Sequence, residues 1–220
     1  MSTRSTSAGA RAGLRTLLAL DIVLLAPREG RLVVFAPDAP RGARRDLPTG
    51  APRAGEGLDA AAQRIARAAL ASGVPWLQQV SARSEGTRTS VIYAGLVTAP
   101  PGDDERWISR ERTGTISAAA RHMVDDAVRA ISAWLDRTPI AFKLLPTTFT
   151  LSELQEVYEV LLGRTLHKAS FRRALQSARL VTPTREWRSE GRGRPAQLFR
   201  FAPKARKASR RGVRFDWLTE

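Results

Sequence analysis

Basic and small polar side chains alternate with apolar ones between positions 168 and 179. The residues whose chemistry suits phosphates and base edges are Lys168, Ser170, Arg172, Arg173 and Gln176. Arginine can bind a guanine edge or a phosphate with paired hydrogen bonds, and serine and glutamine are short hydrogen-bonding groups. The apolar residues between them recur at helical spacing. The pattern predicts a helix that packs on its own domain through one face and contacts duplex DNA through the other. The alternative is a solvated basic face on an ordinary packing helix.

A second group of arginines follows in a polar, glycine-containing segment, 185–194. Its candidate DNA-contacting residues are Arg188, Arg192 and Arg194. Glycines in such a segment let the backbone approach a phosphate or enter a minor groove. Residues 164–214 hold 16 Lys and Arg against two acidic residues, which is nearly the whole net charge of +15. So concentrated a charge indicates a footprint for a polyanion.

The elements that would position these residues can be read from the sequence. Thr150 and Glu153 fit a capping box, in which each side chain satisfies a free amide of the first helical turn. An apolar stripe predicts a helix over 151–162, ended by Gly163, and a second helix follows over 168–178. A strand at 180–182, the loop 185–194 and a return strand at 197–201 complete the expected set. This order is that of a winged helix-turn-helix.

The earlier part of the chain predicts an α+β domain. Strands are expected at 17–25 and 31–35, joined as a hairpin, and at 76–80, 89–97 and 107–108. Helices are expected at 58–70 and 116–135, with loop at 37–56 and a proline-containing joint at 137–148. We therefore divide the chain into a disordered start, 1–13, a first domain, 14–142, a winged helix domain, 143–203, and a basic tail, 204–220.

Composition excludes several classes of protein. There is no cysteine and there are two histidines, so disulfides and thiolate metal sites are excluded and we expect no metal site. No apolar run reaches the roughly 18 residues of a membrane helix. The run 17–26 follows several arginines, but Asp21 interrupts it and no clean cleavage site follows, so we interpret it as a buried strand and not a secretion signal. We expect a cytoplasmic protein without a membrane partner.

The second domain resembles the C-terminal domain of the Nudix-related transcriptional regulators of NAD metabolism, the NrtR family. The resemblance rests on the run 149–159, on Phe171-Arg-Arg, on Gly193-Arg-Pro-Ala196 and on the residues 198–201. Ser170 stands where the family usually has Asn, which bears on the operator sequence and not on the mode of binding. The resemblance implies a Nudix-like α/β/α sandwich for the first domain.

That implied fold directs attention to the Nudix box, in which the glutamates of an Arg-Glu-x-x-Glu-Glu helix hold Mg²⁺ on a diphosphate. The start of the box is matched by Gly50, Glu56 and Arg64. The glutamates are not matched, because the chain has no Asp or Glu between Asp59 and Glu85, and two extra residues appear before Gly73. We therefore expect no catalytic residue, no required cofactor and no hydrolase activity.

The resemblance implies that the first domain binds ADP-ribose, or a similar phosphorylated ribose compound, as an effector. The candidate contacts are Arg44, Arg45, Gly50, Arg53 and Glu56. The resemblance further implies a homodimer that binds a double-stranded operator as a repressor of NAD or related cofactor or sugar metabolism. Two alternatives remain open. One is a Nudix-type hydrolase of ADP-ribose with an appended basic domain, and the other is a nonspecific architectural or RNA-binding protein.

Overall fold

A six-stranded mixed sheet forms the centre of the first part of the molecule. The computed structural model describes residues 17–98, 104–189 and 195–202. The strands are β1 (Leu17–Arg28), β2 (Arg31–Phe35), β3 (Thr49–Gly50), β4 (Trp76–Glu85), β5 (Arg88–Leu96) and β6 (Trp107–Ser109). Their order is β4-β5-β1-β2-β6, and β3 also pairs with β1. Only the β1–β5 pair is parallel among these described strands.

The predicted hairpin of β1 and β2 is confirmed. Its two turn residues, Glu29 and Gly30, have φ angles of 49° and 71°. Both lie in the left-handed region, which is the geometry of the two-residue turn that matches the twist of paired strands. Glycine carries the second position at no steric cost.

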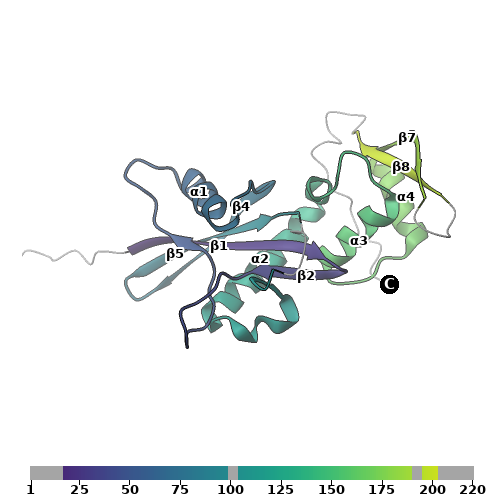
Figure 1. Cartoon of the computed structure of the whole chain (residues 1–220). Helices are drawn as coiled ribbons and strands as arrows, with labels where there is room; N and C mark the ends of the chain where they lie inside the picture. The colour runs from purple at the N-terminus through teal and green to yellow at the C-terminus, as the bar shows by residue number, and fades with distance from the viewer. Residues whose placement is uncertain (1–16, 99–103, 190–194, 203–220) are drawn as a thin grey trace, which may run out of the picture.

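One helix covers each face of this sheet (Figure 1). Helix α1 (Leu58–Leu70) packs on the side chains of Leu20, Ile22 and Leu24, whereas α2 (Ala118–Leu135) packs on the face that holds Val23 and Leu25. Because β1 is buried on both faces, it reads as a continuous apolar run and not as an alternation. The α/β/α sandwich is therefore confirmed.

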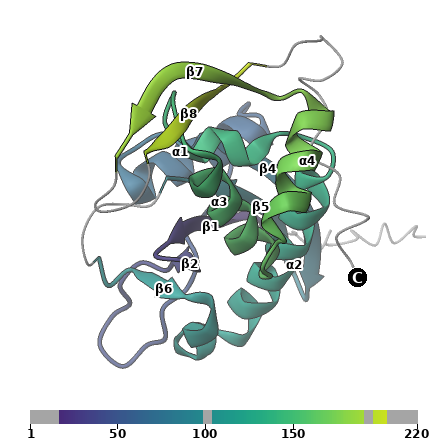
Figure 2. The same cartoon turned by 90° about the vertical axis from the view of Figure 1, so that its right-hand side faces the viewer.

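The second part of the molecule has the predicted winged helix order. A short 3₁₀ segment, η2 (Ile140–Leu144), leads into α3 (Leu151–Leu162), α4 (Lys168–Ala178) and the antiparallel ribbon of β7 (Val181–Arg188) and β8 (Ala196–Phe201). Figure 1 places α3, α4, β7 and β8 together at one end of the molecule, and Figure 2 looks onto that end. None of the helices in the described part of the chain is long and apolar enough to cross a membrane.

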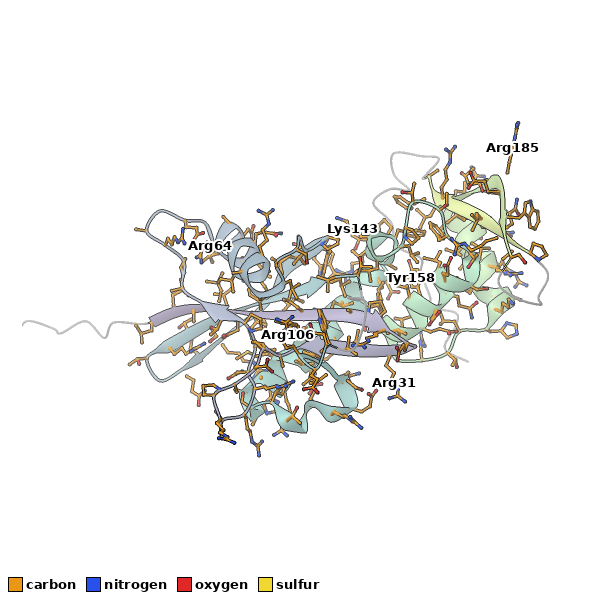
Figure 3. The ribbon with its side chains drawn as sticks, in the orientation of Figure 1. Arg31, Arg64, Arg106, Lys143, Tyr158 and Arg185 are labelled. Atoms are coloured by element: carbon orange, nitrogen blue, oxygen red, sulfur yellow. The ribbon has the colours of Figure 1, made fainter. Side chains whose placement is uncertain are left out.

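The joint between the two parts is packed. One hydrophobic cluster contains residues of β1, β2 and α2 together with residues of α3 and α4. Within the joint, Phe142 is 8% exposed and its ring lies 5.8 Å from that of Phe149 and 4.6 Å from that of Phe201. Lys143 donates a hydrogen bond of 3.1 Å to the Pro75 carbonyl, and Figure 3 shows it between the two parts. Because these side chains belong to one packed core, a displacement of either part has to repack them.

Several predicted boundaries were wrong. The polar stretch 81–88 was expected to separate two strands, but β4 continues to Glu85 and β5 begins at Arg88, because strand ends beyond the core need no apolar residues. The helix expected from 116 begins at Ala118, where the Ser117 hydroxyl accepts a bond of 3.1 Å from the Ala120 amide. A 3₁₀ segment, η1 (Arg110–Thr115), was not predicted. The segments 1–13 and 204–220 lie outside the described residues.

Candidate nucleic-acid interface

Helix α3 begins at the predicted capping box. The Thr150 hydroxyl accepts a hydrogen bond of 3.1 Å from the Glu153 amide, and a Glu153 carboxylate oxygen accepts one of 2.6 Å from the Thr150 amide. At the other end, Gly163 takes a left-handed conformation with φ 66°. Such caps satisfy the free amides and carbonyls of the terminal turns and fix where the helix starts and stops.

Two side chains of α3 hold the turn that leads into α4. The Glu159 carboxylate accepts bonds of 2.8 Å from the Leu166 amide and 2.9 Å from the Gln155 side chain. The same Gln155 amide donates a 2.9 Å bond to the Leu166 carbonyl. The angle between the two helices therefore depends on this pair as well as on apolar packing. Sequence reasoning missed both residues, although their i, i+4 spacing just before a helix end is a pattern that could have been noted.

Helix α4 is fixed through its apolar face. Phe171, Ala174 and Leu175 are buried, and the Phe171 ring meets the Tyr158 ring of α3 edge-on at 5.6 Å. Burial raises the pKa of Tyr158, so its ring is a neutral core group. The opposite face is exposed to solvent, and it presents Lys168, Arg172, Arg173 and Gln176. The two-sided helix predicted from the sequence is thus present.

The exposed face borders an open hollow of 510 Å³. Its lining residues are His167, Lys168, Ala169, Arg172, Arg173 and Gln176. Within the described residues, no ion pair joins the three cations of this set to an acidic side chain. Free amides at the start of a helix add a partial positive charge at the same place. The arrangement suits a polyanion that carries hydrogen-bond acceptors.

Two details differ from the predicted set of reading residues. Ser170 is half-buried and is absent from the lining of the hollow; its hydroxyl lies 3.4 Å from Nδ1 of His167. His167 itself lines the hollow, and sequence reasoning gave it no role. It precedes the first residue of α4, a position that the apolar periodicity does not mark.

The ribbon that follows α4 changes the prediction for the wing. Strand β7 continues to Arg188, so the loop expected from 185 begins after it. The guanidinium of Arg188 lies 2.6 Å from a carboxylate oxygen of Glu153, at the start of α3. Bonds from Thr150 and Arg188 outweigh the opposing effect of burial and lower the pKa of Glu153. Arg188 therefore ties the ribbon to α3, while Arg192 and Arg194 lie outside the described residues.

In the first domain, the start of the Nudix-like motif is held by a carboxylate–guanidinium pair. Glu56 accepts bonds of 2.9 and 2.7 Å from Arg64 and one of 2.8 Å from the backbone amide of Arg53. The bond from Arg64, supported by that from Arg53, lowers the pKa of Glu56 to about 2. Arg64 also donates to the Ala51 carbonyl at 3.0 Å. The loop after β3 is thereby fastened to α1 (Figure 3 shows Arg64).

The other candidate effector contacts have different surroundings. A Cβ added to Gly50 would lie 2.9 Å from Cδ1 of Ile65, so the close approach at this glycine is made by α1. Arg45 pairs with Asp38 at 2.9 Å and also donates to the Glu105 carbonyl. Arg44 and Arg53 are exposed. Gly50, Arg45 and Glu56 thus each have an intramolecular role, which the sequence did not reveal.

Comparison with known proteins agrees with this geometry. Residues 141–201 match the family model of the NrtR DNA-binding winged helix domain. A curated protein of Acinetobacter baylyi, "ADPR responsive transcriptional repressor NtrR", is 29% identical over 143 residues, which are 58% of this chain and 57% of that protein. The chain thus spans little more than half the length of this curated relative.

Solved structures extend the likeness to both domains. Shewanella oneidensis NrtR in complex with a 27mer DNA superposes with a TM-score of 0.71 at 27% identity, covering 90% of this chain and 99% of that one. A MutT/nudix family protein of Enterococcus faecalis shares the fold, with a TM-score of 0.58 at 14% identity over 85% of this chain and 86% of that one.

The molecule is therefore a two-domain protein with a Nudix-like sandwich followed by a winged helix-turn-helix domain. Its second domain matches the NrtR DNA-binding winged helix domain, and the chain as a whole is similar to Shewanella oneidensis NrtR.

Proposed function

We propose that this chain is a homodimeric, cytoplasmic DNA-binding repressor whose operator binding is controlled by ADP-ribose or a similar phosphorylated ribose compound. The observation that carries the proposal is the exposed basic face of α4, with Lys168, Arg172 and Arg173 around an open hollow. The relatives support it, since one is named an ADPR responsive transcriptional repressor and another was crystallised with DNA. A dimer doubles the number of bases that one short helix can read.

The reading residues of the proposal are Lys168, Arg172, Arg173 and Gln176, with His167 beside them. Arginines here would bind guanine edges or phosphates, and Lys168 a phosphate near the helix start. Ser170, which is half-buried, remains a proposed contact. Arg192 and Arg194 are proposed as minor-groove or phosphate contacts on sequence grounds alone. Arg188 is proposed to act by positioning the ribbon.

The first domain is proposed to bind and not to hydrolyse its ligand. Counted from Arg64, the glutamate positions of a Nudix helix fall on Ile65, Ala68 and Ala69. Ile65 is 7% exposed and packs over Gly50, so an apolar contact occupies the position of a metal-binding carboxylate. Helix α1 ends at Leu70, and Ala71 takes the left-handed conformation two residues before Gly73. Arg44 and Arg53, which are exposed, are the proposed phosphate contacts.

The test is an electrophoretic mobility shift with the full chain and a duplex selected from a random-sequence library. We expect a complex of the dimer with the selected duplex, and weaker binding to a scrambled duplex of equal length. Equal affinity for both duplexes would contradict a specific regulator and support a nonspecific architectural role. In parallel, ADP-ribose with Mg²⁺ should yield no product above a protein-free control, and steady turnover would support the hydrolase alternative.

A further inference from the structure

The wing ribbon contains an irregularity that directs one side chain away from the domain. Pro183 pairs with Phe199 and Trp187 with Gln197, so β7 advances four residues while β8 advances two. The bulge is fixed by a 3.0 Å bond from the Thr184 hydroxyl to the Leu198 carbonyl and by a 3.3 Å bond from the Gln197 side chain to the Thr184 carbonyl. Such bulges change the direction of the side chains that follow them, often next to functional sites.

Trp187 is the residue that follows this bulge. Its neighbour Arg188 reaches Glu153 on the inner side of the ribbon, and successive strand residues point to opposite faces. Trp187 therefore lies on the outer face, where it is 57% exposed. By contrast, Trp76 and Trp107 are 6% and 7% exposed in the core of the first domain. Among the large apolar side chains that are exposed in the described part of the chain, Trp187 is the bulkiest, and tryptophan is a residue type enriched where proteins contact their partners.

We infer that Trp187 is a DNA-contacting residue, whose indole packs against the deoxyribose wall of the minor groove beside the reading helix. This inference rests on the proposed function. Figures 1 and 2 place the ribbon and α4 at the same end of the molecule, and Figure 3 shows Arg185, two residues before Trp187, extending away from the body. Arg185 and Trp187 are both exposed, with the exposed Glu186 between them, and proteins that bind the minor groove combine basic side chains with apolar ones.

Charge complementarity identifies the occupant as DNA and not a second copy of this chain. The 16 basic and two acidic residues of 164–214 surround Trp187 in sequence, and α4 presents its cations at the same end of the molecule. A second copy approaching through this end would bring the same charge and be repelled, whereas duplex DNA would be attracted. The indole of Trp187 supplies a large contact area without a charge, so it adds affinity that salt does not screen.

The test compares full-chain variants on a duplex selected by the unaltered protein. Trp187→Ala is expected to lower affinity about tenfold, a change equivalent to 1.4 kcal/mol, and Trp187→Phe by less. The slope of affinity against salt should not change, because an uncharged side chain releases no counterions. Leu17→Ala is the matched control: Leu17 is 66% exposed at the start of β1, in the first domain, and its loss should leave affinity unchanged. Trp187→Phe also removes the fluorescence of Trp187. In the unaltered protein, bound duplex should protect this fluorescence from quenching by acrylamide.

The outcomes separate this inference from the proposed function. If Trp187→Ala binds as tightly as the unaltered protein while Arg173→Ala does not, Trp187 is not a contact and the proposed function stands. If the full chain selects no duplex, both fail. If Trp187→Ala turns a dimer into a monomer in analytical ultracentrifugation, Trp187 lies between copies and the inference is overturned. An unchanged melting temperature of Trp187→Ala, as of Trp187→Phe, would show that the loss of binding is not a loss of fold.

Discussion

The arginines of the two domains have different partners. In the first domain, Arg45, Arg64, Arg83, Arg88 and Arg106 all pair with carboxylates of the same domain. On α4, within the described residues, Lys168, Arg172 and Arg173 have no such pairs and surround an open hollow. The same residue types thus form ion pairs at these five positions of the first domain and remain available to an external polyanion on α4.

This difference shows why net charge alone does not locate a binding surface. A paired arginine contributes little field beyond its own surroundings, because its carboxylate partner cancels it within a few ångströms. The charge of +15 therefore acts mainly through the winged helix domain. The Nudix-like motif of the first domain follows the same rule, since Glu56 is bound to Arg64 and Ile65 packs over Gly50.

The largest expected effect is a loss of stability, and it tests whether Ile65 of the Nudix-like site is part of the hydrophobic core. Ile65→Glu should destabilise the chain by about 2–5 kcal/mol, because it puts a carboxylate where Ile65 is 7% exposed. Ala68→Glu, on the exposed side of the same helix, should change stability by less than about 0.5 kcal/mol. Urea unfolding measures both. A stable Ile65→Glu variant that gains Mg²⁺-dependent hydrolysis would show that the metal site is still open.

The next effect separates available arginines from paired ones. Arg173→Ala should weaken binding to a selected duplex by about 1–3 kcal/mol and reduce the preference over a scrambled duplex, because a base contact is lost. Arg129→Ala removes the same charge from α2, where Arg129 pairs with Asp126, and should have little effect. Fluorescence anisotropy at fixed salt measures both. Equal losses from the two variants would mean that binding follows net charge only.

A smaller effect concerns Arg188, the one wing arginine that has a described carboxylate partner. A double-mutant cycle of Arg188→Ala and Glu153→Gln should give a coupling energy of about 0.5–1 kcal/mol in urea unfolding, since the pair is partly solvated. Arg185→Ala, on the same strand and exposed, should show no coupling to Glu153→Gln. Zero coupling for Arg188, with a loss of DNA affinity instead, would return it to the set of direct DNA contacts.

The smallest effect is an acid dependence in the first domain. The pKa of Glu56 is lowered from 4.5 to about 2 in the folded chain, so its contribution to stability is present above pH 4.5 and is lost as pH falls toward 2. Glu56→Gln should therefore flatten this part of the stability curve, measured by urea midpoints between those pH values. Glu85→Gln, at the exposed end of β4, is the control. Parallel curves for Glu56→Gln and the unaltered chain would contradict the role of the Glu56–Arg64 pair.

Local features of the sequence predicted much of the fold. The helix over 58–70, the capping box at Thr150 and the stop at Gly163 depend on neighbours within one or two turns, and the structure has all three. The apolar face of α4 follows from the same periodicity. Its exposed face then follows by exclusion, because a helix that packs one side must leave the other to solvent.

Contacts between distant segments were not predictable in this way. Arg188 and Glu153 are 35 residues apart, and nothing in a polar, arginine-containing segment distinguishes a strand residue facing α3 from one in a loop. The meeting of Gly50 with Ile65 depends on how α1 lies against β3. The bulge before Trp187 depends on hydrogen bonds across the ribbon. Each needs tertiary geometry that residue spacing does not contain.

We propose that the first domain senses a ligand and that the cations of α4 bind DNA. The hydrophobic core shared by the two domains would couple these two events. The most direct test of this proposal is an anisotropy titration of the full chain bound to a selected duplex, repeated with saturating ADP-ribose. We expect the selected duplex to bind about 10³-fold or more tighter than a scrambled one, and ADP-ribose to change this affinity by about fivefold or more. Equal affinity for both duplexes, or an affinity for the selected duplex that ADP-ribose leaves unchanged, would contradict it.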